Sequence, residues 1–248
     1  SRSEVSILKE AEEITKHPDF KGIIFDVGGP TANMYGIDCS RKLKKGSCKK
    51  RRCLYPSMCR MLNVSHQRQI DLLKHIRNLP GVKKVFVASG IRYDLVLNDK
   101  EWGEVYMREL VAHHISGQMK IAPEHTEEHV LELMGKPSGT YLIRFRELFN
   151  RLNKETGKRQ FLTYYFIAAY PGCDMKDMIK LKSFVSKQLR LRPEQVQIFT
   201  PTPSTYAALM YWTGVNPFST KQIFVERDIK KMEKQKGIMR QEGTKAFL

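Results

Sequence analysis

The sequence has no long hydrophobic segment. No apolar run in its 248 residues approaches the ~18 residues that a membrane helix needs. Residues 1–20 also lack the apolar core of a secretory signal peptide. We therefore predict a soluble, cytoplasmic protein that has no membrane partner. The 41% hydrophobic content suffices for one α/β domain with a large buried core.

Cysteine is scarce, and the five cysteines of a cytosolic-type chain argue against a disulfide framework. Four of them follow the spacing Cys39-x8-Cys48-x4-Cys53-x5-Cys59. Four thiolates on an irregular loop suit tetrahedral zinc or an iron–sulfur cluster, so we predict a metal site there. The alternative is that one or two of them are simply buried. Cys173, after a Pro-Gly turn, is interpreted as incidental.

Acidic residues are outnumbered, because 26 Asp and Glu face 43 Lys and Arg and leave a net charge of +17. Such a field attracts RNA, DNA or another polyanion. Eight of the twelve residues from Arg41 to Arg52 are basic and could bind phosphates. Within this run Lys49, Lys50, Arg51 and Arg52 would lower the pKa of neighbouring thiols. A solvated loop, or an ordinary basic enzyme, explains the same charge equally well.

A strand followed by a helix is the repeating unit of the chain. Five short apolar segments each end in polar, glycine or proline residues and lead into a helical pattern. The segments are 22–35, 85–92, 119–125, 161–172 and 196–203, and the expected helices are 3–16, 66–78, 102–112, 126–134, 140–154, 174–188 and 204–212. This order predicts a parallel sheet with right-handed crossovers, either doubly wound or curled toward a barrel.

Residues 36–65 and the end of the chain break this pattern. The segment 36–65 has little periodicity, so we expect an insertion that a metal orders. The charged segment 225–240 is expected either to dock as a helix or to fray. The predicted domains are therefore 1–220, which contains the insertion, and a helical tail over 221–248.

The first strand carries a glycine pair at its end. Ile23, Ile24, Phe25 and Val27 fit a strand that is buried on both faces. The Gly-Gly-Pro sequence at 28–30 then ends the strand and lets the backbone approach a ligand closely, because glycine has no Cβ.

Two histidine motifs also follow strands or helices. Glu124 and His125 come at the end of a strand, where side chains project over the edge of a parallel sheet. Such a pair can do acid–base or ribose-binding work, or can simply satisfy a helix N-terminus. The adjacent His113 and His114 are a weaker candidate, since neighbouring residues point in different directions.

Taken together, these motifs resemble the YgiQ-type radical SAM proteins over nearly the whole chain. The segments that carry the resemblance are Asp26-Val-Gly-Gly-Pro-Thr-Ala-Asn-Met-Tyr35, Cys53-x5-Cys59, Leu79-Pro-Gly-Val-Lys-Lys84, Ala88-Ser-Gly-Ile-Arg-Tyr-Asp94, Lys120-Ile-Ala-Pro-Glu-His-Thr126 and Phe166-Ile-Ala-Ala-Tyr-Pro-Gly172. The resemblance implies a partial (β/α)6 TIM-like barrel. It also implies reductive cleavage of S-adenosylmethionine by a [4Fe–4S] cluster, with a flavodoxin- or ferredoxin-type reducing partner and an unknown substrate.

The family's cluster motif, Cys-x3-Cys-x2-Cys, is absent from this sequence. In the family the motif lies just upstream of the position that Ser1 takes here. The resemblance therefore implies the C-terminal portion of the catalytic core, without its first strand and cluster loop, which would be inactive alone. The cysteines at 39–59 would then hold an auxiliary iron–sulfur cluster or a structural zinc.

The resemblance also assigns residues to the cofactor. The two glycines match those that bind the methionine amino group, and Pro30 stands where the superfamily usually has Glu. The other positions match strand ends that lie near the ribose or the adenine of the cofactor in related barrels. The full set is Gly28, Gly29, Pro30, Arg92, Glu124, His125, Ala168, Pro171 and Gly172.

Two other function classes stay open from the sequence. One is a basic RNA- or DNA-binding module with a four-cysteine zinc loop, which the net charge supports. The other is a catalytically inactive scaffold that keeps the barrel for contacts with a partner.

Overall fold

A computed structural model describes residues 2–29, 31–48, 52–191 and 195–240 of the chain. These residues form two compact units. The first unit consists of Ser1–Cys48, Met58–Ile121 and Arg144–Thr163, and the second of Lys49–Ser57, Ala122–Ile143 and Tyr164–Leu248. The expected domain boundaries, 1–220 and 221–248, stay a prediction.

Short parallel strands form the centre of the first unit. β1 (Ile23–Ile24) pairs in parallel with β4 (Lys84–Val85). Beyond the strands, the Phe86 N–H donates to the Ile24 carbonyl at 2.9 Å, so the pairing continues toward the strand ends. The Phe25 side chain is 74% exposed. The expectation of a strand buried on both faces is therefore wrong at Phe25.

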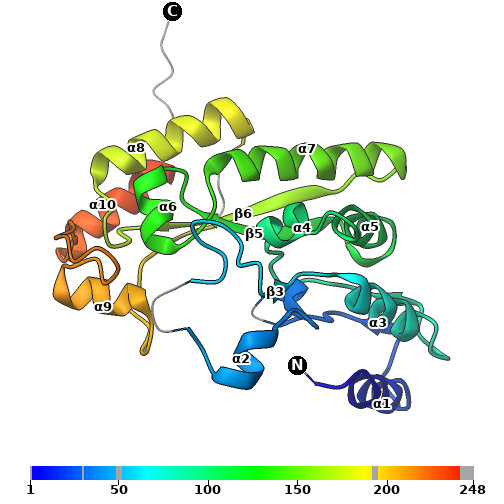
Figure 1. The fold of residues 1–248 in the computed structure, drawn as a ribbon. Coiled ribbons are helices and arrows are strands. Elements are labelled where there is room, and N and C mark those ends of the chain that lie inside the picture. Colours follow the sequence, from blue (N-terminus) through cyan, green and yellow to red (C-terminus); the bar gives the residue numbers. More distant parts are fainter. Residues whose placement is uncertain (1, 30, 49–51, 192–194, 241–248) are drawn as a thin grey trace, which may run out of the picture. The chain divides into compact units, whose positions relative to one another are not determined.

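Outside residues 36–65, the first unit contains several helices, which are labelled in Figure 1. They are α1 (Glu4–Thr15), α3 (Gln67–Arg77), α4 (Tyr93–Asn98), α5 (Gly103–Glu109) with the π-helical turn η2 (Leu110–His114), and most of α7 (Gly139–Glu155). The Ser3 hydroxyl accepts the Ser6 N–H at 3.3 Å and caps α1, whose start agrees with the expected helix over 3–16. Four of the five helices match expected ones. The sequence does not predict α4.

The insertion at 36–65 has secondary structure of its own. In the first unit, η1 (Ala32–Met34) precedes it, and it contains β2 (Asp38–Cys39), α2 (Ser40–Lys45) and β3 (Leu62–Asn63). β2 and β3 pair antiparallel, with Cys39 opposite Leu62. The Leu62 N–H also donates to the Cys59 carbonyl at 2.9 Å. Backbone hydrogen bonds therefore supply part of the order that we had expected a metal to supply.

The second unit contains the C-terminal parts of two strands, from Ala122 and from Tyr164 on, and one complete strand after them. A three-stranded sheet has the order β5 (Gln118–Glu124), β6 (Phe161–Ala168), β7 (Gln195–Ile198). β6 and β7 run parallel, with Tyr165 opposite Gln195 and Ala168 opposite Ile198. The helices of this unit are α6 (Glu128–Met134), α8 (Met175–Phe184) with the π-helical turn η3 (Val185–Leu189), α9 (Tyr206–Thr213) and α10 (Ile229–Arg240).

The charged segment near the C-terminus is a docked helix. α10 packs against α8 and β7 and buries Met232 and Met239, so the docked alternative is confirmed for residues 229–240. The chain is thus a mixed helix and sheet protein with short parallel pairings. None of its helices, over the described residues, is long and apolar enough to cross a membrane. The partial barrel stays a prediction.

Candidate functional site

The loop after β1 is fixed to the loop after β4. The Asp26 carboxylate accepts the backbone N–H groups of Ala88 at 2.9 Å and Ser89 at 3.2 Å, and also the Ser89 hydroxyl. The Ala32 N–H donates to the Gly90 carbonyl at 3.0 Å. A carboxylate that accepts several backbone donors holds both loops in one arrangement. The glycine pair at 28–29 is therefore positioned by its neighbours.

The two glycines have different surroundings. A Cβ at Gly28 would lie 2.8 Å from the Ser89 Cβ and 2.9 Å from the Asp26 carboxylate, so this position needs glycine for packing. A Cβ at Gly29 would meet nothing within 4 Å. Both glycines line a pocket of about 530 Å³ in the first unit. Packing therefore explains why residue 28 is glycine, but it does not explain why residue 29 is glycine.

Two buried polar atoms line the same pocket. The Gln69 side chain is 2% exposed, and its Nε2 donates to the Ala32 carbonyl at 2.6 Å. Its Oε1 and the Tyr35 hydroxyl have no hydrogen-bond partner within the described part of the chain. The rest of the wall is largely apolar and comes from α1, β1 and α3. An unpaired polar atom costs free energy when buried, so a polar ligand group at this wall would be stabilised.

A buried histidine network lies beside these loops. The His66 Nδ1 lies 2.7 Å from the Asp99 carboxylate, which also accepts the His66 backbone N–H at 2.8 Å. The Asn33 amide lies 3.2 Å from the other ring nitrogen of His66. Burial lowers the pKa of His66 in spite of Asp99, so the ring is neutral. Asn33 Nδ2 donates to its Nε2, and the Nδ1 proton is donated to Asp99.

No spacing in the sequence indicates this network, because its members are dispersed along the chain. Asn33 also holds Arg92, since its Oδ1 accepts the Arg92 N–H at 2.8 Å and its Nδ2 donates to the Arg92 carbonyl at 3.0 Å. The Arg92 guanidinium donates to the Asp94 carboxylate at 2.8 to 3.1 Å. Arg92 lies after β4 as expected, but Asp94 engages its charged group.

In the second unit, two strands end in strained residues. Glu124 at the end of β5 has a φ of 66°, and Ala169 directly after β6 has a φ of 56°. The left-handed region is unfavourable for both residue types, and such strain is often found at functional sites. The Glu124 carboxylate lies 2.9 Å from the Lys136 ammonium, which also donates to the Ala122 carbonyl at 2.5 Å. Lys136 therefore neutralises Glu124.

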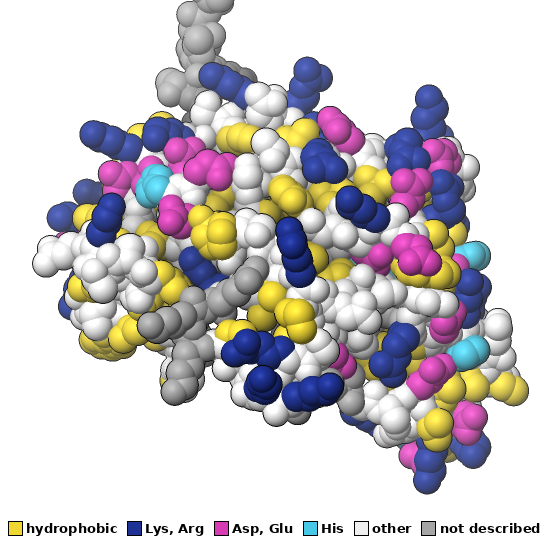
Figure 2. Space-filling view, viewed as in Figure 1, with side chains coloured by type: hydrophobic (Ala, Val, Ile, Leu, Met, Phe, Trp, Pro, Cys, Tyr) yellow, Lys and Arg dark blue, Asp and Glu magenta, His cyan; other side chains and the backbone are white. Residues whose placement is uncertain are grey.

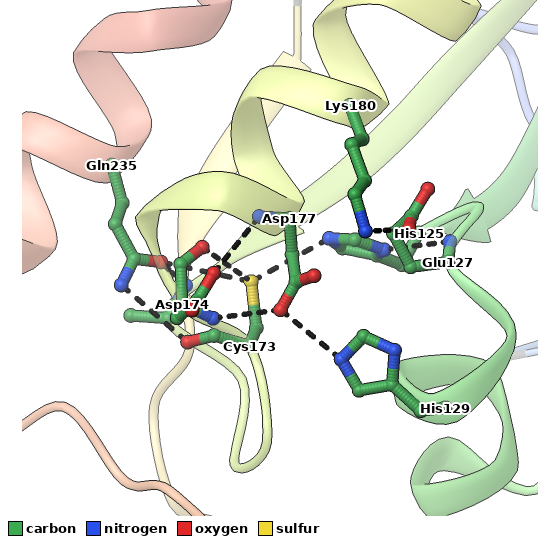
Figure 3. Close-up of polar contacts among 9 residues, drawn as sticks. His125, Glu127, His129, Cys173, Asp174, Asp177, Lys180 and Gln235 are labelled. Atoms are coloured by element: carbon green, nitrogen blue, oxygen red, sulfur yellow. Dashed lines mark hydrogen bonds and ion pairs between the residues drawn. The ribbon is translucent and has the colours of Figure 1, made fainter.

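His125 is a buried residue that contacts Cys173 (Figure 3). Its Nδ1 accepts the Glu127 N–H at 3.0 Å, and its Nε2 lies 3.5 Å from the Cys173 sulfur. Burial lowers the pKa of His125 to about 3 and raises the pKa of the Cys173 thiol. The His125 imidazole and the Cys173 thiol are therefore both neutral and do not form a thiolate–imidazolium pair. Cys173 is thus part of a buried polar cluster that also includes Gln235, whose Oε1 accepts the Ala169 N–H at 2.9 Å.

The other residues that the resemblance assigns to the adenine lie at the end of β6 and directly after it. Ala168 and Pro171 are buried, and Gly172 is half-buried with a φ of 92°. A Cβ at Gly172 would lie 2.2 Å from the Leu133 Cδ1, so packing explains this glycine. Pro30 lies outside the described residues, as do Lys49, Lys50 and Arg51.

The cysteines of the insertion differ in exposure. Cys39 and Cys48 are half-buried, Cys53 is exposed and Cys59 is buried. Cys39, Cys48 and Cys59 belong to the first unit. Among the described residues, none of the three lies in a group of three or more potential ligands that is close enough to hold one ion. The four-cysteine metal site therefore stays a prediction.

A different group in the second unit has the geometry of a metal site. The ligand atoms of Glu127, His129 and Asp177 all lie within 4.8 Å of one another. The three residues come from the N-terminal ends of α6 and α8. The sequence analysis did not identify them, because Asp177 lies in a different segment from the other two.

The sequence of this chain is similar to those of several proteins that share the name UPF0313 protein. A UPF0313 protein from Fusobacterium nucleatum subsp. nucleatum is 56% identical over 239 residues, which are 96% of this chain and 42% of that protein. UPF0313 proteins from Methanosarcina mazei and Clostridium perfringens are 48% and 42% identical, over 96% and 100% of this chain and 37% of each relative. No protein-family model matches the chain. The chain thus spans less than half the length of these curated relatives, whose names state no activity.

Proposed function

We propose that this chain forms the S-adenosylmethionine-binding part of a radical SAM protein of the YgiQ type. The observation that carries the proposal is the position of Gly29. It lies at the end of a parallel strand, faces open space, and lines a pocket of about 530 Å³. Pockets for small molecules typically measure about 300–1,000 Å³, and ligands of parallel α/β folds bind at the strand ends.

The pocket offers suitable groups for the methionine part of the cofactor. Backbone carbonyls at the glycine pair can accept hydrogen bonds from an ammonium group, since no side chain keeps it away. The unpaired Gln69 Oε1 can accept another, and the Tyr35 hydroxyl can bind a carboxylate. The apolar wall suits the methylene groups.

In radical SAM enzymes a [4Fe–4S] cluster supplies the electron that cleaves the cofactor. This sequence has no Cys-x3-Cys-x2-Cys, so the proposal requires cysteines outside these 248 residues. The greater length of the relatives leaves room for such a segment. A reducing partner and a substrate of unknown class belong to the same proposal for the whole protein.

Calorimetric titration of the chain with S-adenosylmethionine tests the proposal. Gly29→Val should weaken binding by at least about tenfold, because the new side chain occupies the pocket without a clash elsewhere. Gly237→Val is the matched control, since a Cβ at Gly237 in α10 also meets nothing within 4 Å. Equal affinity of the two variants would place the ligand elsewhere. Failure of the chain to bind millimolar cofactor would contradict the proposal.

A second candidate function is binding of RNA or another polyanion. α2 carries exposed Arg41, Lys42, Lys44 and Lys45, and Lys and Arg side chains gather over this helix in Figure 2. Phosphate binding should weaken steeply as salt rises, whereas cofactor binding should change little. A quadruple substitution of these residues by Gln should remove the salt-dependent RNA binding. RNA binding that is insensitive to salt and to this variant would contradict the second candidate.

A further inference from the structure

We propose that Glu127, His129 and Asp177 bind a divalent metal ion. Each side chain offers one ligand atom, and these atoms all lie within 4.8 Å of one another. Ligand atoms around one ion at ~2.1 Å must lie about 3–4 Å apart. Small rotations of the exposed His129 and the partly exposed Glu127 side chains around the buried Asp177 carboxylate would bring the three atoms into that range. The proposed site shares no residue with the pocket at Gly29.

The best-defined edge of the site joins α6 to α8. The His129 Nε2 lies 3.1 Å from the Asp177 Oδ2, a separation that fits either a hydrogen bond or two ligands of one ion. His129 is 53% exposed, whereas the Asp177 carboxylate is nearly buried. The exposed ring can adjust to an ion, and its proton can move to the other ring nitrogen.

Asp177 is held in place before any metal binds. Its Oδ2 accepts the Asp174 N–H at 3.0 Å, and the Asp174 carboxylate in turn accepts the Asp177 N–H at 3.0 Å. This capping box fixes the first turn of α8. A ligand that is fixed by a second hydrogen-bonded residue loses little entropy when it binds an ion.

Glu127 is the third ligand and has a competing cation. Its Oε2 lies 3.1 Å from the Lys180 ammonium, and Lys180 is 60% exposed (Figure 3). An exposed ion pair of this kind contributes little free energy, so a divalent ion can displace the lysine. Lys180 should therefore weaken metal binding without preventing it.

The ligand set of one imidazole and two carboxylates determines which metal ions the site prefers. Imidazole suits zinc, iron and copper, whereas carboxylates suit manganese and magnesium, so a mixed set favours a first-row divalent ion. Three protein ligands leave positions for water or substrate. Such an ion would also connect the N-terminal turns of α6 and α8.

Mn²⁺ is the probe for this site, because the cysteines of the chain favour softer ions. Electron paramagnetic resonance of free Mn²⁺ in titrations of the whole chain gives the bound fraction. His129→Gln and Glu127→Gln should each weaken Mn²⁺ binding by about tenfold or more. Lys180→Gln should tighten it. Asp177 is unsuitable for substitution, because its loss would also break the cap of α8.

His75→Gln is the matched control. His75 is 58% exposed and lies 2.5 Å from a carboxylate, that of Glu4, but belongs to no group of three potential ligands among the residues that the structure describes. It should bind Mn²⁺ as the unmodified chain does. Urea midpoints without metal show whether each variant is folded. Equal Mn²⁺ binding by His129→Gln and His75→Gln, or no effect of Lys180→Gln, would overturn the proposal.

Discussion

The imidazole Nδ1 of His66 lies 2.7 Å from the Asp99 carboxylate, and both side chains are buried. In this pair the ring is uncharged, because burial lowers its pKa more than Asp99 raises it. His66 stacks on Tyr106 with the ring centroids 4.7 Å apart. The pair thus joins the start of α3 to the segment before α5 and fixes the loops around the glycine pair.

The chain should lose stability in mild acid. Burial lowers the pKa of His66 and lowers that of His125 to about 3, against ~6.5 in the unfolded chain. Below pH 6.5 the unfolded state therefore binds more protons than the folded state. For each histidine that stays neutral in the folded protein, the free energy of unfolding should fall by about 0.7 kcal/mol per pH unit at pH 6.5, and this slope approaches about 1.4 kcal/mol per unit at lower pH. Urea unfolding at pH 7, 6 and 5.5 measures this slope.

The control for the pH dependence is again His75→Gln, which removes an exposed histidine. This variant should still lose stability in mild acid, because His66 and His125 are both retained. A free energy of unfolding that stays constant from pH 7 to pH 5.5 would show that the buried rings can be protonated in the folded state.

The two adjacent glycines after β1 should respond differently to alanine. Gly28→Ala forces a Cβ to within 2.8 Å of Ser89 and should cost about 1–3 kcal/mol. Gly29→Ala meets nothing and should be neutral or slightly stabilising, since alanine reduces the entropy of the unfolded chain. Urea midpoints of the two variants give the comparison. Equal losses would mean that the backbone conformation, not the contact, requires both glycines.

The order of strands and helices could be predicted from the sequence because each element has a local signal. α3 shows apolar positions at helical spacing, and Ser3 and Asp174 cap helices at the expected starts. α4 was missed, because its six residues are too few to show a period. The prediction that Phe25 is buried was wrong, because a hydrophobic side chain does not show by itself which face of a strand is covered.

The candidate sites could be predicted only in part. Gly28 and Gly29 carry a local signal, the break after an apolar strand, and both line a pocket. The network of Asn33, His66 and Asp99 depends on side chains far apart in sequence, so no spacing could reveal it. The same holds for the group of Glu127, His129 and Asp177, which requires α6 and α8 to be placed together.

Gly172 should be among the least replaceable glycines of the second unit. Its φ of 92° disfavours any side chain, and a Cβ would lie 2.2 Å from Leu133. Gly214→Ala isolates the backbone cost, because Gly214 has a φ of 68° with nothing within 4 Å, and should cost about 1–2 kcal/mol. Gly172→Ala should cost about 1–3 kcal/mol more.

A double-mutant cycle separates the two costs at Gly172. Leu133→Ala removes the colliding methyl group, so Gly172→Ala should cost less in that background than alone. Urea unfolding of the four proteins gives the coupling free energy. If the two substitutions are additive, the contact with Leu133 contributes nothing and the backbone conformation accounts for the whole effect.

Arg52 has a structural role in the second unit, although the sequence places it in a basic run that could bind phosphate. Its guanidinium donates to the Glu132 carbonyl at 2.9 Å and the Leu133 carbonyl at 3.1 Å, in the last turn of α6. The same group lies over the Phe218 ring at 4.2 Å and the Tyr55 ring at 4.7 Å. Arg52 therefore caps α6 and holds the part of the insertion around Tyr55 against it.

Arg52→Ala should lower the free energy of unfolding by about 1–3 kcal/mol, because two carbonyl groups and two ring contacts lose their partner. Arg52→Lys should restore only part of this, since lysine lacks the planar group whose two nitrogens reach both carbonyls while the same group lies over the rings. Lys44→Ala on the exposed surface of α2 is the control and should change stability little. If Arg52→Lys matches the unmodified chain, charge alone suffices at this position. If Arg52→Ala is as stable as Lys44→Ala, the guanidinium contacts carry no net free energy, and Arg52 is available to bind phosphate with the rest of the basic run.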